Sequence, residues 1–238
     1  MAEEKDVLIL FSGGKDSFLS TLLMIEQGYK VNLVTYENSC GLQAFNVNYG
    51  INRLKQKYGE NTIKFLGVKN IVAIWRELLY PYYNESLNKI LREYGDLPIS
   101  EFNCLSCRLA MYIASIILCK QSNIKIVVDG ARKSQLFAIE QEKMLHAFET
   151  FFKSYGITIL FPVKDLEEDY ELKNEILIRG FVPKTIEPQC LLGMPAKQCD
   201  NRDEIIEASK NVFDKLLKNK ACSLIEKYSN IKLEGNFF

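Results

Sequence analysis

The order of apolar and polar positions along the chain predicts an α/β fold. Short apolar runs rich in β-branched residues alternate with longer segments in which apolar residues recur every three or four positions. The apolar runs predict strands at 7–10, 30–36, 62–68, 124–128 and 157–161. The periodic segments predict helices at 18–25, 48–58, 72–79, 109–120, 136–155, 170–180 and 201–228. This alternation is typical of a parallel sheet flanked by helices, a Rossmann-like arrangement.

Two helix boundaries follow from local signals. Pro81 predicts that the helix over 72–79 stops there, because proline disfavours helical geometry in the residue before it. The polar stretch 103–108 predicts that the next helix starts only at residue 109.

The segment after the first strand carries the strongest chemical signal in the chain. Residues 11–17 read Phe-Ser-Gly-Gly-Lys-Asp-Ser. Adjacent glycines let the backbone turn sharply and present its N–H groups to an oxyanion, and the helix that starts there adds the positive end of its dipole. We therefore predict a phosphate-binding loop with a nucleotide as ligand. A plain turn capped by Ser12 or Ser17 is the simpler alternative, but such a turn needs neither Lys15 nor Asp16.

Two common nucleotide-binding loops are excluded by their spacing. The Walker A loop has Ser or Thr after its lysine, whereas Asp16 follows Lys15 here, and no glycine stands five positions before Gly14. The dinucleotide fingerprint Gly-x-Gly-x-x-Gly is absent as well, because the two glycines of this loop are adjacent.

The chain contains seven cysteines, an odd number that argues for thiol, metal or cluster chemistry instead of a disulfide framework. Cys104 and Cys107 form a Cys-x-x-Cys pair that we expect at the mouth of the helix over 109–120. A helix N-terminus stabilises thiolates, and this spacing lets both sulfurs reach one metal or one cluster, or form a redox pair. Two buried cysteines without chemistry are the alternative, and Cys40, in the loop after the second strand, has the same two interpretations.

The loop Ser-Gly-Gly-Lys-Asp-Ser after the first strand resembles the PP-loop of the ATP pyrophosphatase superfamily. Members of that superfamily split ATP between its α- and β-phosphates and adenylate a substrate. The residues that the resemblance assigns to ATP are Ser12, Gly13, Gly14, Lys15, Asp16 and Ser17. It also implies catalytic roles for Lys15 and Asp16, a contact of Asp16 with Mg²⁺, and a second nucleotide-side turn at Asp129, Gly130 and Arg132.

The PP-loop, the Cys-x-x-Cys pair and a third cysteine downstream of a Phe-Pro … Glu-Leu … Arg-Gly segment together resemble the iron–sulfur-dependent tRNA thiolases. Those enzymes hold a 4Fe–4S cluster by three cysteines and leave one iron free to carry sulfide. The resemblance implies Cys104, Cys107 and Cys190 as cluster ligands and catalytic residues, with Cys199 as a rival to Cys190. The composition agrees with sulfur ligands, because the chain has one histidine, His146, in a helical pattern, and a structural zinc site made of thiolates needs four of them.

These resemblances imply ATP-dependent adenylation, with AMP and pyrophosphate as products, followed by transfer of sulfur from a separate donor to a tRNA base or a small molecule. The deazaguanine nitrile synthases have a similar loop and provide an adenylating alternative without sulfur transfer. The sulfonucleotide reductases share the fold without splitting ATP. A nucleotide-sensing module that turns nothing over is the alternative outside the enzymes, and pyrophosphate release distinguishes it from the enzymes that split ATP.

Length and charge set the remaining expectations. A chain of 238 residues with 47% apolar residues suits one large domain, predicted over 1–195, and a helical extension over 196–238. Equal numbers of basic and acidic residues, 30 each, give no global attraction to nucleic acid, so any RNA contact is local. The acidic start and the short apolar run at 111–119 predict neither a secretory signal nor a membrane span. We expect a cytoplasmic protein with no membrane partner, and a homodimer is one assembly open to it.

Overall fold

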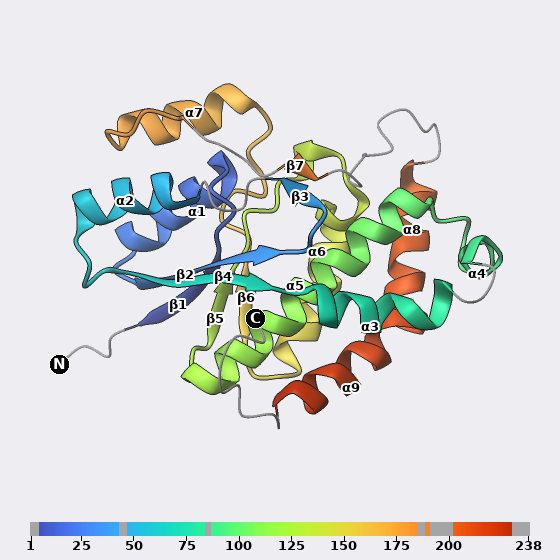
Figure 1. Ribbon diagram of the computed structural model, residues 1–238. Coiled ribbons are helices and arrows are strands. Elements are labelled where there is room, and N and C mark those ends of the chain that lie inside the picture. Colours follow the sequence, from blue (N-terminus) through green and yellow to red (C-terminus); the bar gives the residue numbers. More distant parts are fainter. Residues whose placement is uncertain (1–4, 43–46, 84–86, 185–188, 191–201, 230–238) are drawn as a thin grey trace.

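A computed structural model describes residues 5–42, 47–83, 87–184, 189–190 and 202–229 (Figure 1). Its centre is a five-stranded sheet in which every neighbouring pair runs parallel, in the order β4-β2-β1-β5-β6. The strands are β1 (Asp6–Leu10), β2 (Lys30–Glu37), β4 (Ile63–Asn70), β5 (Ile126–Val128) and β6 (Thr158–Leu160). The predicted parallel α/β fold is therefore confirmed, and all five predicted strands form.

The strand order creates a crevice beside β1. From β1 the chain builds outward through β2 to β4, and then crosses to the other side of β1 to form β5 and β6. The connections that leave β1 and β5 consequently diverge at the carboxyl ends of these strands, which is where open parallel sheets bind ligands. The phosphate-loop segment follows β1 and the Asp129 turn follows β5, so both predicted nucleotide-binding segments reach this crevice.

Helices cover both faces of the sheet (Figure 1), so the strands at its centre, β1 and β2, are mostly buried, whereas the edge strand β4 is mostly half-buried. One face packs against α1 (Lys15–Glu26), α2 (Val47–Tyr58) and α7 (Asp169–Ile178). The other face packs against α3 (Val72–Tyr83), α4 (Leu87–Glu93), α5 (Ile99–Ser122), α6 (Glu142–Lys153), α8 (Arg202–Val212) and α9 (Lys218–Ser229). The sheet positions the crevice, and the two helical layers hold it rigid.

Helix α5 forms the centre of the larger layer. Among the described residues it alone is long and apolar enough to span a membrane, but 67% of its most apolar window is buried inside the fold. Such burial is typical of a core helix. The helix is also longer than the short apolar run at 111–119 suggested.

Helix α5 begins ten residues earlier than predicted, at Ile99. The stretch 103–108 contains polar side chains, but these find partners that are compatible with a helix. The Trp75 indole N–H donates to Ser106 Oγ at 3.0 Å, and the Tyr83 hydroxyl donates to Asn103 Oδ1 at 3.1 Å. Tertiary hydrogen bonds of this kind offset the weak helix propensity of Asn and Ser, and no local signal announces them.

Helix α3 continues through Pro81 to Tyr83, so the predicted break is wrong. Proline removes one backbone hydrogen bond, but here it stands only two residues before the helix ends. The last turn is held from outside, since the Tyr82 hydroxyl donates to the Leu216 carbonyl at 3.1 Å and the Tyr83 hydroxyl binds Asn103.

The predicted helix over 136–155 forms only from Glu142 onward, as α6. Two short 3₁₀ turns, η2 (Lys133–Gln135) and η3 (Ala138–Glu140), precede it, and Leu136 between them has a left-handed backbone with φ 70°. This geometry turns Glu140 into the protein, where it meets Arg108. The prediction failed because the partner of Glu140 lies 32 residues away in the sequence.

The predicted C-terminal helix over 201–228 forms as α8, a π-helical turn η4 (Phe213–Leu217) and α9. Phe213 and Leu217 belong to the same hydrophobic cluster as α5 and α6, and the Phe148 and Phe213 rings meet edge to face at 5.4 Å. These helices therefore share the core of the sheet domain, and the boundary at residue 195 stays a prediction.

Candidate active site

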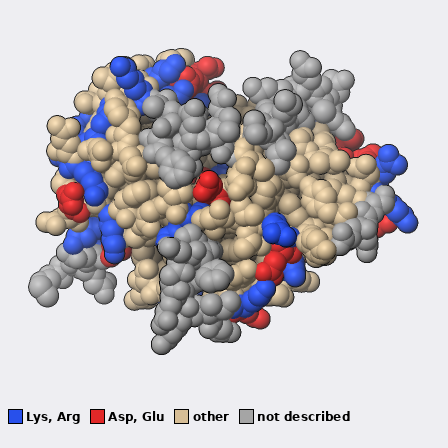
Figure 2. Space-filling model, viewed as in Figure 1, with Lys and Arg blue, Asp and Glu red and all other residues tan. Residues whose placement is uncertain are grey.

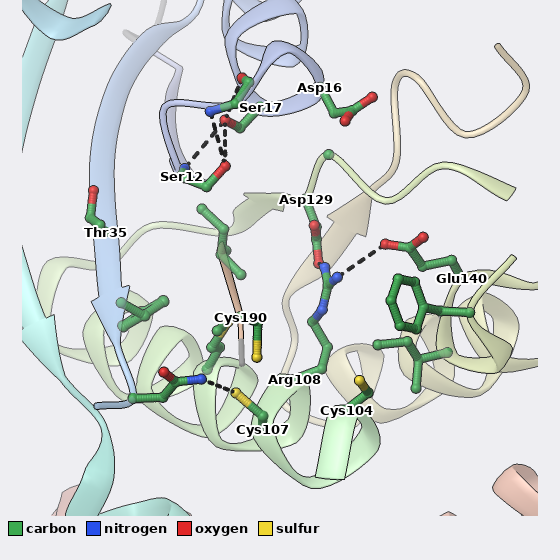
Figure 3. A pocket seen from close by; sticks show the side chains of 18 of the residues that line it. Ser12, Asp16, Ser17, Thr35, Cys104, Cys107, Arg108, Asp129, Glu140 and Cys190 are labelled. Atoms are coloured by element: carbon green, nitrogen blue, oxygen red, sulfur yellow. Dashed lines mark hydrogen bonds and ion pairs between the residues drawn. The ribbon is translucent and has the colours of Figure 1, made fainter. Parts of the chain in front are cut away.

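A cavity of about 430 Å³ lies at the carboxyl ends of β1, β2 and β5 (Figure 3). Its walls come from six places in the sequence: the loop after β1, the end of β2, Trp75 of α3, helix α5, the segment from the turn after β5 to η3, and Cys190. Its polar and sulfur-bearing lining residues include Ser12, Asp16, Ser17, Thr35, Asn38, Asn103, Cys104, Cys107, Arg108, Asp129, Gln135, Glu140 and Cys190. The phosphate loop and three cysteines predicted to act together thus border one space.

The loop after β1 is shaped by two serines. The backbone N–H of Ser12 donates to Ser17 Oγ at 3.2 Å, and the N–H of Gly14 donates to Ser12 Oγ at 3.2 Å. Ser17 Oγ in turn donates to the Gly14 carbonyl at 3.0 Å. Gly13 has φ 81°, a left-handed geometry that glycine adopts without strain. These hydrogen bonds hold the loop in shape, and the first turn of α1 begins directly behind it.

Gly130 brings the turn after β5 against the phosphate loop. A Cβ at this position would lie 2.8 Å from the Ser17 backbone nitrogen and 2.9 Å from the Asp16 carbonyl carbon. Both atoms belong to the backbone of α1, so they cannot move aside cheaply. Glycine is therefore needed here for close approach, and this explains the residue that the sequence analysis assigned to the nucleotide-side turn.

Replacing Gly130 by alanine should separate the two turns. We expect a loss of about 1–3 kcal/mol in the free energy of unfolding, as in overpacked cores, and weaker ATP binding in calorimetry. Gly156→Ala is the matched control, because no atom lies within 4 Å of a Cβ there and only its φ of 70° is strained. ATP binding by Gly130→Ala at wild-type strength would contradict this role for Gly130.

The two charged residues of the loop are held by partners from other segments. Lys15 Nζ forms an ion pair with Asp169 Oδ1 of α7 at 2.6 Å. Hydrogen bonds from Lys15 and then Lys173 lower the pKa of Asp169 to about 2. Asp16 forms an ion pair with Arg132, with 2.9 Å between Oδ1 and Nε, and its Oδ2 accepts a hydrogen bond from Gln135 Nε2 at 2.8 Å. The structure therefore places Arg132 on Asp16, and the assignment of Lys15, Asp16 and Arg132 to ATP stays a prediction.

A buried charge network occupies the wall between α5 and the turn after β5. Arg108 pairs with Asp129 at 2.5 Å and with Glu140 at 3.1 Å (Figure 3). The Tyr112 hydroxyl donates to Asp129 at 2.6 Å. Both carboxylates are only 4% exposed. Burial raises the pKa of Glu140 to about 7, with Arg108 opposing this shift and Asp129 and Asp16 adding to it.

Cys104 and Cys107 lie inside α5 instead of at its mouth, and the expected stabilisation of their thiolates is not found. Burial, with further contributions from Glu101 and neighbouring thiols, raises the pKa of Cys104 to about 12. Burial also raises the pKa of Cys107 to about 11, although the Asn38 amide donates to its sulfur at 3.0 Å and lowers it. The helix dipole acts mainly on the first turn, and these thiols lie beyond it.

Cys190 reaches the cavity through a short ribbon that the sequence did not predict. Strand β7 (Gln189–Cys190) pairs antiparallel with β3 (Gly41–Leu42), so that Cys190 stands opposite Gly41. Cys190 lines the same cavity as Cys104 and Cys107, and it adds to the raised pKa values of Cys40, Cys104 and Cys107, for which burial is the largest cause. The rival residue Cys199 lies outside the described residues.

The thiols fit an iron–sulfur cluster by their chemistry but not by their spacing. Among the described residues, no three Cys, His, Asp or Glu side chains are gathered closely enough to hold a metal ion. His146 is no ligand candidate, because its side chain is 78% exposed on the outer side of α6, near Glu149.

The comparisons with known proteins agree with this architecture. A model of the family described as thiamine biosynthesis protein (ThiI) matches residues 2–139, more than half of the chain. The chain belongs to the ThiI family. It is therefore a member of the PP-loop ATP pyrophosphatase superfamily, as the Ser-Gly-Gly-Lys-Asp-Ser loop predicted. No curated protein sequence matches it.

Solved structures resemble this ThiI-family chain in fold. A 4-thiouridine synthetase, crystallised with RNA and bound ATP, aligns with 94% of the chain and 53% of its own length, at a TM-score of 0.59 and 14% identity. NMN synthetase from Francisella tularensis aligns with 96% of the chain and 85% of its own length, at a TM-score of 0.50 and 16% identity. The U34-tRNA thiolase NcsA from Methanococcus maripaludis, with its 4Fe–4S cluster, aligns with 95% of the chain and 70% of its own length, at a TM-score of 0.47 and 15% identity. The chain thus spans about half the length of the 4-thiouridine synthetase.

Several residues of the cavity were not predicted from the sequence. Arg108 follows Cys107 directly, and a basic residue beside a Cys-x-x-Cys pair was a usable signal. Glu140 gave no such signal, because it lies within the range 136–155 that was predicted to be a helix. Asn38 and Gln135 also gave no signal in the sequence, because their partners Cys107 and Asp16 are distant in the sequence and meet them only in the folded protein.

Proposed function

We propose that the chain adenylates a carbonyl acceptor with ATP and that a sulfur nucleophile then displaces AMP from the adenylate. The observation that carries this proposal is the single cavity bordered by the phosphate loop on one side and by Cys104, Cys107 and Cys190 on another. Transfer of sulfur to an adenylated carbon requires that the ATP site and the sulfur source both lie within contact distance of one acceptor.

The phosphate loop supplies what the first step needs. The acceptor carbonyl oxygen attacks the α-phosphorus, the bond to the β-phosphate oxygen breaks, and pyrophosphate leaves. Negative charge grows on the phosphate oxygens as this occurs, and the backbone N–H groups of the loop, with the N-terminus of α1, stabilise it. Asp16 as a Mg²⁺ ligand is part of the proposal, since a divalent cation would balance the charge of the triphosphate.

The second step uses the leaving group that the first step creates. A carbonyl oxygen leaves poorly, whereas AMP leaves readily once sulfur has added to the carbon. We place Cys104, Cys107 and Cys190 at this step as the residues that position the sulfide nucleophile beside the adenylate. Their service as ligands of a 4Fe–4S cluster is the finer form of the proposal; their shared cavity supports it, and it requires the thiols to lie closer together than the described residues have them.

We propose a base of tRNA as the acceptor and the cytoplasm as the place of reaction. The 4-thiouridine synthetase of similar fold was crystallised with RNA and ATP, which supports an RNA acceptor. Acidic and basic side chains are interspersed on the face shown in Figure 2, with basic ones more numerous around α2 and β4. Lys57 and Lys64 are exposed on these two elements and are suited to contacts with phosphates.

A labelling experiment tests the proposal. Protein purified without oxygen is mixed with ATP, radiolabelled sulfide and an unmodified tRNA transcript. We expect label in the RNA and one AMP released for each sulfur incorporated. AMP release without label would favour an adenylating enzyme of the deazaguanine nitrile synthase type, and ATP binding without AMP would favour the nucleotide-sensing module. Either result would contradict the proposed sulfur transfer.

A further inference from the structure

The end of α3 presents two aromatic side chains to solvent. Tyr80 is 63% exposed and Tyr83 is 52% exposed, whereas Tyr82 between them is half-buried. Tyr80 and Tyr83 are one helical turn apart, so they are neighbours on one face of the helix. Isolated apolar side chains are common on protein surfaces, but aromatic rings placed side by side in water mark a candidate interaction site.

The last turn of α3 is fixed from two sides. The Tyr83 hydroxyl donates to Asn103 Oδ1 at 3.1 Å, and the Tyr82 hydroxyl donates to the Leu216 carbonyl at 3.1 Å. The first of these bonds also connects the exposed rings to the candidate active site, because Asn103 lines the cavity. A ligand that covers Tyr83 therefore lies at the border of the cavity, on a surface that is rigid before the ligand binds.

The charges on α3 favour an anionic partner. Arg76 stands one turn before Tyr80 on the same face, is exposed, and forms no ion pair with another described residue. Glu77 is the one acidic residue of α3, and both of its oxygens accept hydrogen bonds from Lys227 of α9 at 2.7 Å. The exposed face of α3 thus combines two open aromatic rings with a cation that has no acidic partner.

We propose that Tyr80 and Tyr83 stack on unpaired bases of the RNA acceptor while Arg76 binds a phosphate of the same strand. Aromatic rings that stack on bases, together with basic side chains that contact the backbone, are the means by which proteins bind single-stranded nucleic acid. The nucleotides bound here are those next to the reacting base, because this surface begins at the wall of the cavity. The inference rests on the proposed RNA acceptor, and it adds a docking surface outside the cavity.

The size of this surface suits nucleotides better than a protein. A fully covered aromatic side chain buries about 150–250 Å², so two half-exposed rings offer only about 200–300 Å². A stable protein–protein interface covers about 800 Å² on each partner. One base, by contrast, covers the face of one ring, so that the two tyrosines suit two nucleotides of a single strand.

Binding of a short RNA tests the surface without any catalysis. The probe is a fluorescent single strand of oligouridine, about eight nucleotides long, and fluorescence anisotropy measures its affinity. We expect Tyr80→Ala and Tyr83→Ala each to weaken binding by about 5- to 100-fold, through the loss of one stacked base. Tyr80→Phe keeps the ring and should restore the affinity. Tyr170→Ala is the matched control, because Tyr170 is 61% exposed on α7, which packs on the other face of the sheet, and it should bind as the wild type does.

Arg76 and the form of the nucleic acid give a second readout. Each phosphate contact with a single strand adds about 0.7 to the slope of log affinity against log salt concentration, so Arg76→Gln should reduce that slope by about 0.7. The same oligouridine paired with oligoadenosine should bind more weakly than the single strand, because bases inside a duplex cannot cover the two rings. Equal affinity for the duplex and the single strand would overturn stacking as the mode of binding.

The outcomes separate this inference from the proposed function. If the wild type incorporates sulfur into the transcript while folded Tyr80→Ala and Tyr83→Ala bind oligouridine within about twofold of it, the docking surface is overturned and the function stands. If binding depends on the tyrosines as expected but no sulfur enters any RNA, the sulfur transfer fails and the RNA-binding surface stands. Sedimentation of the same variants provides the last check: loss of a dimer in Tyr80→Ala without loss of oligouridine affinity would show an interface between copies of the chain and overturn the inference.

Discussion

Replacing Gly13 by valine is expected to abolish ATP binding. Gly13 has φ 81°, a left-handed geometry that a β-branched side chain adopts only with strain of about 1–3 kcal/mol. Its neighbours Ser12 and Gly14 bind each other through the serine hydroxyl, so relief of the strain would pull the N–H groups of the loop out of position. Hydrogen bonds to a charged partner contribute about 1.5–3 kcal/mol each, and loss of two should weaken binding by at least about 100-fold. Calorimetry with ATP measures this.

Gly28→Val is the matched control for that variant. Gly28 has φ 83° and no atom within 4 Å of a Cβ, and it ends α1 on the side away from the phosphate loop. Valine there introduces the same backbone strain without touching the cavity, so stability should fall while ATP affinity is retained. Equal losses of ATP affinity in both variants would show that Gly13 acts through stability alone.

Replacing Cys104, Cys107 or Cys190 by alanine is expected to stop sulfur transfer and to leave ATP binding intact. The three thiols border the cavity on the side of α5 and β7, apart from the loop that holds the phosphates. Loss of a residue that only supports a metal ligand lowers activity about 10–100-fold, so loss of a thiol itself should cost at least about 100-fold. Radiolabelled sulfide incorporation and the iron content after purification without oxygen measure the effect.

Two further cysteine variants make this result specific. Cys119→Ala removes a buried thiol from the same helix, outside the cavity, and should retain full transfer. Cys199→Ala decides which residue is the third sulfur ligand. If Cys190→Ala keeps its iron and Cys199→Ala loses it, the third ligand is misassigned. If none of the variants loses transfer, the thiols have no part in the reaction.

The elements predicted correctly are those whose signals are local. The buried strands appear as apolar runs because both of their faces are covered, and the sharp turn after β1 is marked by its adjacent glycines, of which Gly13 has φ 81°. Gly28 and Gly180 follow α1 and α7 with φ 83° and 75°, the left-handed geometry with which glycine commonly ends a helix. In each case the residues that decide the structure are adjacent in the sequence.

The elements predicted wrongly depend on residues that are distant in the sequence. Pro81 remains in a helix because Leu216 and Asn103 bind the tyrosines after it. Ser106 lies in a helix because Trp75 binds it. The β3–β7 ribbon is only two residues long on each side, too short to give an alternating pattern, although it is what brings Cys190 to the cavity.

The candidate site was predictable as a list of residues but not as a network. The phosphate loop and the cysteines were found from their motifs, and the fold brings them together as expected at the carboxyl ends of the strands. The contacts of Arg108 with Asp129 and Glu140 were not predictable, since they join three segments whose only common property is their position in the fold.

The central claim, that ATP is split between its α- and β-phosphates in this cavity, is tested most directly by identifying the products. ATP radiolabelled at the α-phosphate, and in a parallel reaction at the γ-phosphate, is incubated with the protein, Mg²⁺, sulfide and the tRNA transcript, and the products are separated by chromatography. The account predicts labelled AMP in the first reaction and labelled pyrophosphate in the second. Labelled ADP and labelled orthophosphate would contradict it.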